Sequence, residues 1–336
     1  MTNRIGDYTI TFPDPPKWKA GYAIVGPKEG RGPLANYFDY VLRTDSFNEK
    51  TYELAERKMM EQAISGATAK AGLISTDIDT LVAGDLLNQI ISASFSARQF
   101  GVGFLGMFGA CSTMTESLIV GSCLIGGNFA NNVACSTSSH FSTAERQFRY
   151  PLELGCQRPP TAQWTVTGSG CSILSKEGKG HNIVMATIGR VVDYGINDMN
   201  NMGAAMAPAA ADTLCKLFHD TKTKPQDYDL IVTGDLGKLG GELLIDLLEQ
   251  KGYKVDQNYF DCGQAMFSDT QKAFMGGSGC GCSATIMNSY IFDKLSDGSY
   301  KKVILMSTGA LLSTTSSFQG ETIPGIAHAV VVEKGM

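Results

Sequence analysis

DIDTLVAGDL at residues 77–86 returns as DYDLIVTGDL at residues 227–236, and this repeat decides the fold. Each copy has an acidic lead-in, a short apolar strand pattern and a Gly-Asp turn. A second pair of segments, 109–138 and 279–308, follows in the same order, each with a glycine-rich turn, a helical stretch and a strand that ends in serine and threonine. Ordered self-similarity of this kind indicates duplication. The sequence therefore predicts a duplicated α/β unit.

The segments around the repeats alternate between strand and helix patterns. Strands are predicted at 80–84, 104–108, 132–136, 183–188, 229–233, 303–307 and 329–333, and helices at 50–73 and 208–218. The second helix has Pro208 in its first turn, where proline is tolerated. This alternation predicts a largely parallel sheet with helices on its faces, organised in two halves, residues 1–190 and 191–336. Ligands bind at the carboxyl ends of such strands.

Composition excludes several classes of protein. The chain has 336 residues, of which 43% are hydrophobic and 18% charged, so a disordered protein is excluded. Its net charge of −5 provides no global basic field for nucleic acid. No apolar run reaches the roughly 20 residues of a membrane helix, and the first residues lack the apolar core of a signal peptide. We expect a soluble intracellular protein without a nucleic-acid partner.

The nine cysteines favour reduced thiols, because their number is odd and no export signal is present. Cys280 and Cys282 are closely spaced, but no second pair lies at the distance of a zinc site. The sequence therefore predicts neither a resident metal nor a cofactor.

The candidate nucleophile is Cys111, in the segment FLGMFGACSTMTE at residues 104–116. A strand pattern ends before it, and Thr113 and Glu116 have the spacing of a capping box that starts a helix. The dipole and free N–H groups of a helix start lower the pKa of a thiol and favour the thiolate. Cys111 is therefore a candidate nucleophile or anion contact. The alternative is a small buried cysteine beside a tight turn.

This elbow, in a chain that is doubled, resembles the thiolase fold of thiolases and ketoacyl synthases, a five-layered αβαβα fold. In that family each half is a βαβαβ unit, and the nucleophilic cysteine lies at the start of the first half's buried helix, which Cys111 matches. The other catalytic groups, two histidines or a histidine and an asparagine, come from second-half loops. Here those loops are TGDL at 233–236 and GGSGCGC at 276–282, with no histidine or asparagine. The resemblance implies an incomplete catalytic set.

Longer strings carry a narrower resemblance, to the stage V sporulation protein AD family, from about residue 20 to the C-terminus. They are AGDLLNQ at 83–89, MFGACST at 107–113, SSHFSTAERQFRYP at 138–151, MGAAMAPAAAD at 202–212, GGSGC at 276–280 and ETIPGIAH at 321–328. The resemblance implies a non-catalytic thiolase relative of endospore-forming bacteria that binds dipicolinic acid and takes part in its uptake into the spore. It also implies membrane proteins of the spore dipicolinate channel as partners, a peripheral location on the cytoplasmic side of the forespore or spore inner membrane, and a homodimer.

Dipicolinate is a flat pyridine with two carboxylates that often chelates calcium, so its site needs fork-like donors and an apolar surface. Arg146 and Arg149 could pair with a carboxylate, or instead form salt bridges with Glu145, Glu153 or the other half of the chain. Helix starts at 111–113 and 281–283 could offer backbone N–H groups. The candidate ligand-binding residues are Cys111, Ser112, His140, Arg146, Arg149, Asp235, Ser278, Gly279 and His328.

The roles of three of these residues are open. His140 ends a Ser/Thr-rich strand and His328 precedes an apolar one, and either could approach Cys111 or be structural. Asp235 and its repeat equivalent Asp85 could cap the following turn or, as a minority interpretation, face calcium.

Two other functions stay open at this point. One is a thiolase-type or ketoacyl-synthase-type acyltransferase that uses Cys111 as nucleophile, with His328 as its partner and an acyl thioester as substrate. The other is a purely structural assembly subunit, which binds no small ligand.

Overall fold

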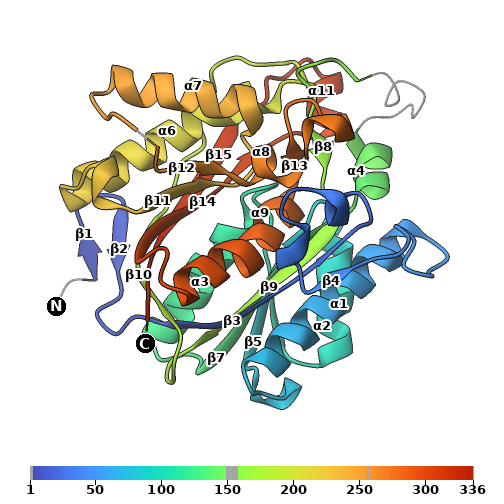
Figure 1. Ribbon diagram of the computed structural model, residues 1–336, viewed down its shortest axis with the longest axis vertical. Helices are drawn as coiled ribbons and strands as arrows, with labels where there is room; N and C mark the ends of the chain where they lie inside the picture. Colours follow the sequence, from blue (N-terminus) through green and yellow to red (C-terminus); the bar gives the residue numbers. More distant parts are fainter. Residues whose placement is uncertain (1–2, 149–157, 256, 336) are drawn as a thin grey trace.

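The computed structural model describes residues 3–148, 158–255 and 257–335. Two five-stranded units follow each other along the chain (Figure 1). The first contains β3 (Lys17–Val25), β5 (Thr80–Asp85), β6 (Gly103–Gly106), β7 (Asn132–Ser139) and β9 (Gly168–Ser175). The second contains β10 (His181–Thr187), β11 (Leu230–Thr233), β12 (Tyr259–Asp261), β14 (Lys302–Ala310) and β15 (Gly325–Glu333).

Both units have the same topology. The spatial order is β6-β5-β7-β9-β3 in the first and β12-β11-β14-β15-β10 in the second, which is the third, second, fourth, fifth and first strand of each unit. The pairings also match: β5 is parallel to β6 and β7, β11 is parallel to β12 and β14, and the two remaining pairings in each unit are antiparallel. The predicted duplication is confirmed. By strand order the second unit begins with β10, and the division at residue 190 stays a prediction.

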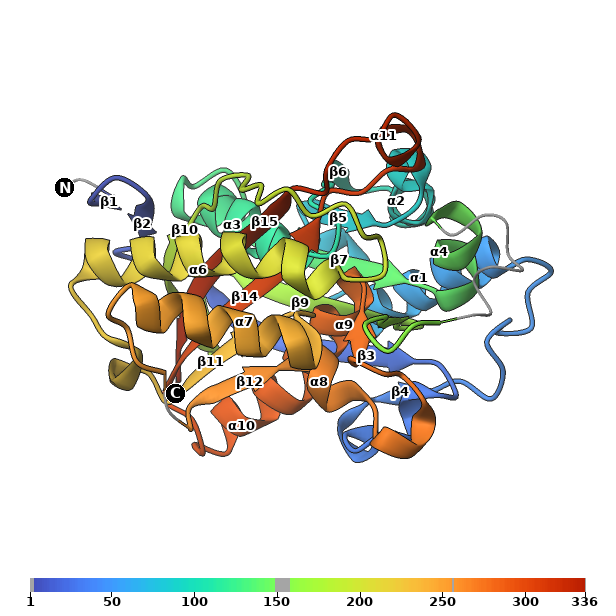
Figure 2. The same ribbon diagram turned by 90° about the horizontal axis from the view of Figure 1, so that it is seen from above.

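Helices form three layers around the two halves of the sheet. α1 (Tyr52–Lys70) and α2 (Ile91–Phe100) cover the outer face of the first unit, and α6 (Met202–Thr221) and α7 (Gly237–Gln250) cover that of the second. α3 (Thr113–Gly126) and α9 (Cys280–Ile286) lie between the two halves (Figures 1 and 2). The two halves join through a short pairing of β10 with β3. The result is the predicted αβαβα layering.

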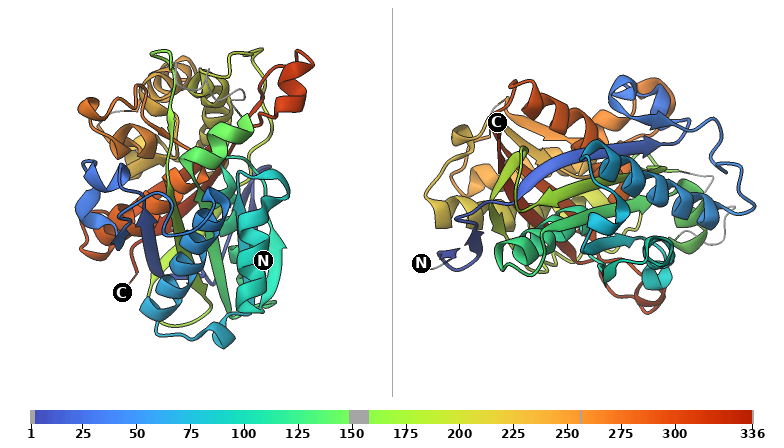
Figure 3. Two further views of the ribbon diagram at one scale, coloured as in Figure 1. Left: turned by 90° about the vertical axis from the view of Figure 1, so that its right-hand side faces the viewer. Right: turned by 90° about the horizontal axis from the view of Figure 1, so that it is seen from below.

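The remaining elements are short. The helices are α4 (Phe141–Phe148), α8 (Cys262–Met266), α10 (Phe292–Ser296) and α11 (Thr314–Phe318). The strands are β1 (Arg4–Ile5), β2 (Thr9–Thr11), β4 (Tyr40–Val41), β8 (Trp164–Thr165) and β13 (Gly277–Ser278). Figure 3 shows α4 and α11 near one end of the molecule. Across the described ranges, no helix is long and apolar enough to cross a bilayer.

The position predicted for Pro208 is wrong. α6 begins at Met202, six residues earlier, where the side chain of Asn201 accepts from the N–H of Ala204 at 3.4 Å. Pro208 lies inside this helix and is buried. Proline in a helix interior removes one backbone hydrogen bond and normally costs about 3 kcal/mol. Packing of the alanine-rich face of α6 against the second half of the sheet outweighs that local preference.

Candidate functional site

Cys111 lies in the turn between β6 and α3. Ala110 adopts a positive φ of 51°. Two hydroxyls close the turn: Ser112 Oγ donates to the carbonyl of Gly109 and Thr113 Oγ1 to the carbonyl of Ala110, each at 2.7 Å. The N–H of Gly109 donates to Thr113 Oγ1 at 3.0 Å. Local hydrogen bonds therefore fix the position of the thiol at the start of α3.

The predicted capping box is wrong. Thr113 is the first residue of α3 rather than its N-cap, and its hydroxyl belongs to the turn. Glu116 Oε2 is buried and has no hydrogen-bond partner among the described residues. Burial also raises the pKa of Glu116. The turn before α3, rather than a reciprocal side-chain cap, sets where this helix begins.

Asp235 is the buried acid of the site. It follows β11, and its Oδ1 accepts from Thr308 Oγ1 at 2.8 Å. Its Oδ2 accepts from the N–H of Gly279 at 3.0 Å and from Ser278 Oγ at 3.2 Å. The thiol of Cys111 lies beside this carboxyl group, close enough for the charge of Asp235 to act on it. Burial raises the pKa of Asp235 to about 7, although these donors oppose the rise.

The two repeat-equivalent aspartates have different roles. Asp85 Oδ1 and Oδ2 accept from the N–H groups of Leu87 and Ala93, both at 2.8 Å, so Asp85 caps the turn as predicted. Asp235 does not cap the turn that follows it. Asp261 does this instead, and accepts from the N–H groups of Leu236 and Gly237 at 2.9 Å. The carboxyl of Asp235 is thereby left to face Cys111.

The predicted lowering of the thiol pKa is wrong. The pKa of Cys111 is raised well above its usual value, first by burial and then by the negative charge of Asp235. A helix start favours a thiolate by only about 1 kcal/mol, which is less than the cost of burying that charge beside a carboxylate. Cys111 is therefore a protonated thiol at neutral pH.

The N–H groups at the two helix starts are largely occupied. Those of Ser112 and Thr113 bond to carbonyls within the turn at 3.0 and 3.4 Å. That of Gly281 donates to Ser139 Oγ at 3.1 Å, and that of Cys282 to a carbonyl at 2.9 Å. The anion-binding role predicted for these groups therefore has no support from the geometry, because a donor that is already paired offers little to an anion.

A narrow cavity of about 40 Å³ opens beside Cys111. Its walls are mostly apolar and its polar atoms lie near the thiol. Leu86, Phe108, Ala110, Cys111, Ala144, Glu145, Phe148, Thr165, Met202, Ser278, Ala310 and Leu312 line it. An outer cavity of about 380 Å³ shares Phe108, Phe148 and Leu312 with it. The two cavities are therefore adjacent, and these three side chains belong to the wall between them.

The two candidate histidines are fixed by other contacts. Nδ1 of His140 accepts from the N–H of Ser142 at 3.1 Å, so its Nε2 carries the proton and donates to the carbonyl of Asp45 at 3.0 Å. Nδ1 of His328 accepts from the N–H of Gly189 at 3.1 Å. Burial lowers the pKa of both rings, to about 4 for His328. Neither histidine lines the cavity.

Arg146 does not line the cavity. It forms an ion pair with Glu53 at the surface, so the alternative of a salt bridge is right in kind, but its partner is neither Glu145 nor Glu153. Arg149 lies outside the described residues. Sequence reasoning missed Arg158, which pairs with Glu145 at the cavity wall and lies over the stacked rings of Phe141 and Trp164.

The structure thus brings together four of the nine candidates: Cys111, Asp235, Ser278 and Gly279. Thr308 was missed, although it lies in the Ser/Thr-rich end of β14 where the repeat pointed. Phe108, Phe148 and Leu312 were also missed, because apolar walls carry no motif. In the described part of the chain, no group of three or more His, Cys, Asp or Glu side chains could hold a metal ion.

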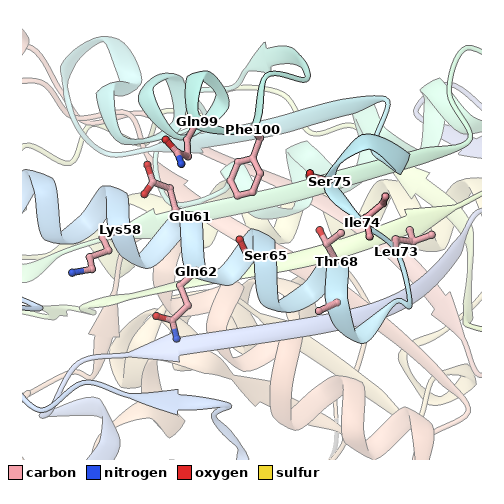
Figure 4. Close-up of a pocket in the computed structure, with 11 residues that line it drawn as sticks. Lys58, Glu61, Gln62, Ser65, Thr68, Leu73, Ile74, Ser75, Gln99 and Phe100 are labelled. Carbon is pink, nitrogen blue, oxygen red and sulfur yellow. The ribbon is translucent and has the colours of Figure 1, made fainter.

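A larger groove lies elsewhere, on the outer face of the first unit (Figure 4). It measures about 760 Å³ and lies beside α1, with Glu61, Gln62 and Gln99 among its lining residues. It is open, and its charged groups are already paired, Lys58 with Glu49 and Glu61 with Arg57. Functional pockets have convergent, buried polar groups, so we place the candidate site at Cys111.

Buried carboxyl groups should make folding depend on pH. Burial raises the pKa of Glu29 and Asp235 to about 7, and it also raises the pKa of Glu56 and Asp85, with the charge of Asp85 adding to the rise for Glu56. A carboxyl group whose pKa is higher in the folded state stabilises the fold at low pH, and this contribution is lost as the pH rises through the folded pKa.

We therefore expect the melting temperature to fall by several degrees between about pH 5 and about pH 8, since each unit of pKa shift corresponds to about 1.4 kcal/mol. Glu56→Gln should make this fall shallower, because a neutral amide replaces one of the titrating groups. Thermal unfolding followed by circular dichroism measures the melting temperatures of the wild type and of this variant across the pH range. A melting temperature that rises over this interval contradicts the assignment.

Comparison with known proteins identifies relatives over nearly the whole chain. The model of the family "Stage V sporulation protein AD" matches residues 6–333. Stage V sporulation protein AD of Bacillus subtilis (strain 168) is 47% identical over 329 residues, which cover 98% of this chain and 97% of that protein.

Solved structures match the fold. 3-Oxoacyl-[acyl-carrier-protein] synthase III from Aquifex aeolicus VF5 gives a TM-score of 0.60 at 13% identity, over 95% of this chain and 99% of the other. Human mitochondrial 3-ketoacyl-CoA thiolase, in complex with CoA, gives a TM-score of 0.58 at 11% identity, over 96% of this chain and 98% of the other. These matches confirm the thiolase-like fold, and at such identities they establish the fold alone.

Proposed function

Because the chain belongs to the stage V sporulation protein AD family, we propose that it acts in sporulation by binding dipicolinic acid and taking part in the uptake of this acid into the developing endospore. One observation carries the binding role: a cavity at the former catalytic position ends on a protonated thiol and a buried carboxyl group instead of a nucleophile and a base. Such a floor can hold a ligand, but it supplies no thiolate.

The side chains that line the cavity suit a flat aromatic acid in chemistry. Phe108, Phe148, Leu86 and Leu312 supply apolar surface for a ring, and Ser278 and Thr165 supply hydroxyls. As described, the space of about 40 Å³ holds roughly three waters. Entry of a ring therefore requires Phe108 or Phe148 to move toward the outer cavity.

The charge of the ligand must be neutralised. No cation lines the cavity in the ranges the structure describes; Glu145 lines it but is paired with Arg158, and Asp235 lies behind the lining residues Cys111 and Ser278. A dicarboxylate beside an ionised Asp235 is strongly repelled at low dielectric. We propose that the calcium-free dianion binds with Asp235 protonated, or that the acid enters as its calcium chelate, whose charges cancel.

We propose that the chain is not an enzyme. A thiolase-type acyl transfer needs a thiolate and a base within reach of it. The thiol of Cys111 is protonated, and His328 bonds to Gly189 instead of lining the cavity. Incubation with an acyl thioester should leave the mass of the Cys111 peptide unchanged. A covalent acyl adduct on Cys111 would revive the acyltransferase function.

The test of the site is Cys111→Ala, with Cys123→Ala as the matched control. Cys111 forms part of the cavity wall, whereas Cys123 is exposed on α3. We expect the first variant to weaken binding of pyridine-2,6-dicarboxylate by about fivefold, or about 1 kcal/mol, because it removes contact area from the wall, and the second to bind normally. Calorimetry measures the affinities and thermal unfolding checks the fold. Equal affinities for the two variants would place the ligand elsewhere.

We also propose a homodimer formed through β6. This strand lies at the end of the strand order, and Leu105, Gly106 and the following Phe108 are exposed. An uncovered apolar edge strand readily pairs with another chain. Phe108 lines both cavities, so pairing at this edge also shields the candidate site. Light scattering should give twice the mass of the chain.

The remaining partners follow from the uptake role. We propose that the chain lies peripherally on the cytoplasmic side of the forespore or spore inner membrane, beside the membrane proteins of the dipicolinate channel. This placement is compatible with a structure in which no described helix could span the bilayer.

A further inference from the structure

The wall of the narrow cavity contains a buried ion pair. Among the lining residues that the structure describes, Glu145 on α4 alone carries a charged side chain. Its Oε1 accepts from Nη2 of Arg158, and the two side chains are 8% and 7% exposed. Arg158 does not itself line the cavity. Glu145 therefore stands at the wall, with the guanidinium group behind it.

The guanidinium group of Arg158 is also held by contacts that do not involve Glu145. Its Nη1 donates to the carbonyl of Gln163 at 2.7 Å. Its central carbon lies 5.0 and 4.8 Å from the ring centroids of Phe141 and Trp164, which stack on each other at 3.8 Å. Arginine stacks well on aromatic faces and presents its N–H groups in one plane. These contacts therefore keep the guanidinium in place when another carboxylate replaces that of Glu145.

The segment that holds the guanidinium leads to the polar end of the cavity. Gln163 immediately precedes β8, in which Thr165 lies opposite Ser278 of β13. Thr165 and Ser278 both line the cavity. The side chain of Gln163 also donates to the carbonyl of Asp235 at 2.7 Å. One strand thus fixes the position of the guanidinium relative to the two hydroxyl groups.

We propose that Glu145 holds the place of a ligand carboxylate, and that Arg158 binds this carboxylate once Glu145 has been displaced. A guanidinium pairs with any carboxylate in the same planar geometry, so one ion pair replaces another. The second carboxylate of the ligand then faces the hydroxyls of Thr165 and Ser278. Neither the empty nor the loaded protein leaves a buried guanidinium unpaired, which would be strongly destabilising. The inference rests on the proposed binding of dipicolinic acid and names the cation that this acid meets.

Entry of the ligand and displacement of Glu145 are linked by α4. Glu145 and Phe148 are three residues apart on this helix and both line the cavity, so they share one face. Phe148 is one of the two rings that must move to admit a ligand. The helix lies beside β8 (Figure 1). A shift of α4 that withdraws Phe148 therefore also carries Glu145 away from Arg158.

The alternative is an ion pair that only fastens α4 to the neighbouring segment. Buried ion pairs often stabilise a fold no better than apolar residues do, whereas a cavity for a dicarboxylate needs a partner for the charge of its ligand. The two interpretations differ in one respect. Only in the proposal does Arg158 affect the ligand after Glu145 has been made neutral.

The test is a calorimetric titration with pyridine-2,6-dicarboxylate in calcium-free buffer at about pH 6, below the pKa of about 7 of Asp235. Glu145→Gln should bind about tenfold more tightly than the wild type, because the competing charge is gone and Arg158 keeps its other contacts. The double variant Glu145→Gln/Arg158→Gln should bind at least about tenfold more weakly than Glu145→Gln. It removes both charges, so no carboxylate is left buried without its cation. Equal affinities of these two variants overturn the proposal.

The matched controls are Glu53→Gln and Glu53→Gln/Arg146→Gln. They make the same exchanges in an ion pair that joins α4 to α1 at the surface. Both should bind as the wild type does, and thermal unfolding checks that every variant folds. A gain in Glu53→Gln as large as that in Glu145→Gln would show a general effect of charge and would also overturn the proposal.

A second ligand separates the two possible failures. If the wild type binds the pyridine acid but Glu145→Gln and the double variant bind it equally, the proposed function stands and the role of Arg158 fails. If the wild type does not bind the pyridine acid, but Glu145→Gln binds isophthalate and the double variant does not, the role of Arg158 stands and the proposed function fails. Absence of binding of either acid to every protein overturns both.

Discussion

Replacing Asp235 by asparagine is expected to abolish the pH dependence of pyridine-2,6-dicarboxylate binding. Asp235 is buried, has a pKa of about 7 and lies behind Cys111 and Ser278, two residues that line the cavity. Above that pKa the ionised carboxylate must take up a proton before a dianion can bind beside it. In calcium-free buffer the affinity of the wild type should therefore fall about tenfold per pH unit above pH 7 and level off below it. An asparagine is neutral throughout, so at about pH 8 the variant should bind about tenfold more tightly than the wild type.

The matched control for this experiment is Asp85→Asn. Asp85 is the repeat equivalent of Asp235 and is also buried, but its carboxyl group caps the turn after β5, whereas that of Asp235 accepts from Ser278, a lining residue of the cavity. This variant should lose stability, because a cap is weakened, and should keep the pH dependence of ligand binding. Calorimetric titrations across the pH range measure the pH dependence of ligand binding in both variants, and thermal unfolding measures their stability. An Asp235→Asn protein that keeps the wild-type slope, or a wild-type affinity that rises above pH 7, would contradict the role of Asp235.

Filling the cavity is expected to abolish binding. Ala144 is buried on α4 and lines the narrow cavity. Ala144→Leu places a larger side chain where the ring of the ligand would lie, and we expect a loss of affinity of at least about a hundredfold, or about 3 kcal/mol. The protein should still fold, since overpacking of this kind costs about 1–3 kcal/mol.

The control is Ala69→Leu, the same exchange on an exposed position of another helix, α1. It should bind as the wild type does. Circular dichroism of both variants separates loss of the site from loss of the fold. Wild-type affinity in a folded Ala144→Leu protein would rule out this cavity as the ligand site.

The sequence predicted the fold where the two halves repeat each other. The Gly-Asp turns after β5 and β11 and the Ser/Thr-rich ends of β7 and β14 located the strands that carry the site. Of the ten strands in the two units, β3, β9 and β12 were missed. The strand β9 is GSGCSILS, which has too many small residues to give a strand pattern. The structure explains these residues: a Cβ on Gly170 would lie 2.2 Å from the carbonyl oxygen of Ala284, so α9 can lie this close to β9 only over glycine.

The site was predictable where it depends on chain connectivity. Cys111 precedes α3, Ser278 and Gly279 precede α9, the repeat equivalent of α3, and Asp235 follows β11, so the duplicated topology places them together. Side-chain orientation was not predictable in the same way. Asp85 and Asp235 occupy matching positions, yet Asp261, a residue outside the repeated motif, takes over the cap in the second half and changes what Asp235 does.

The most direct measurement is a calorimetric titration of the wild-type chain with pyridine-2,6-dicarboxylate, with and without calcium. Isophthalate is the control, since it keeps both carboxylates and lacks the ring nitrogen. We predict saturable binding that is selective for the pyridine acid. No binding heat under any of these conditions would contradict the central claim and would favour an assembly subunit or an acyltransferase.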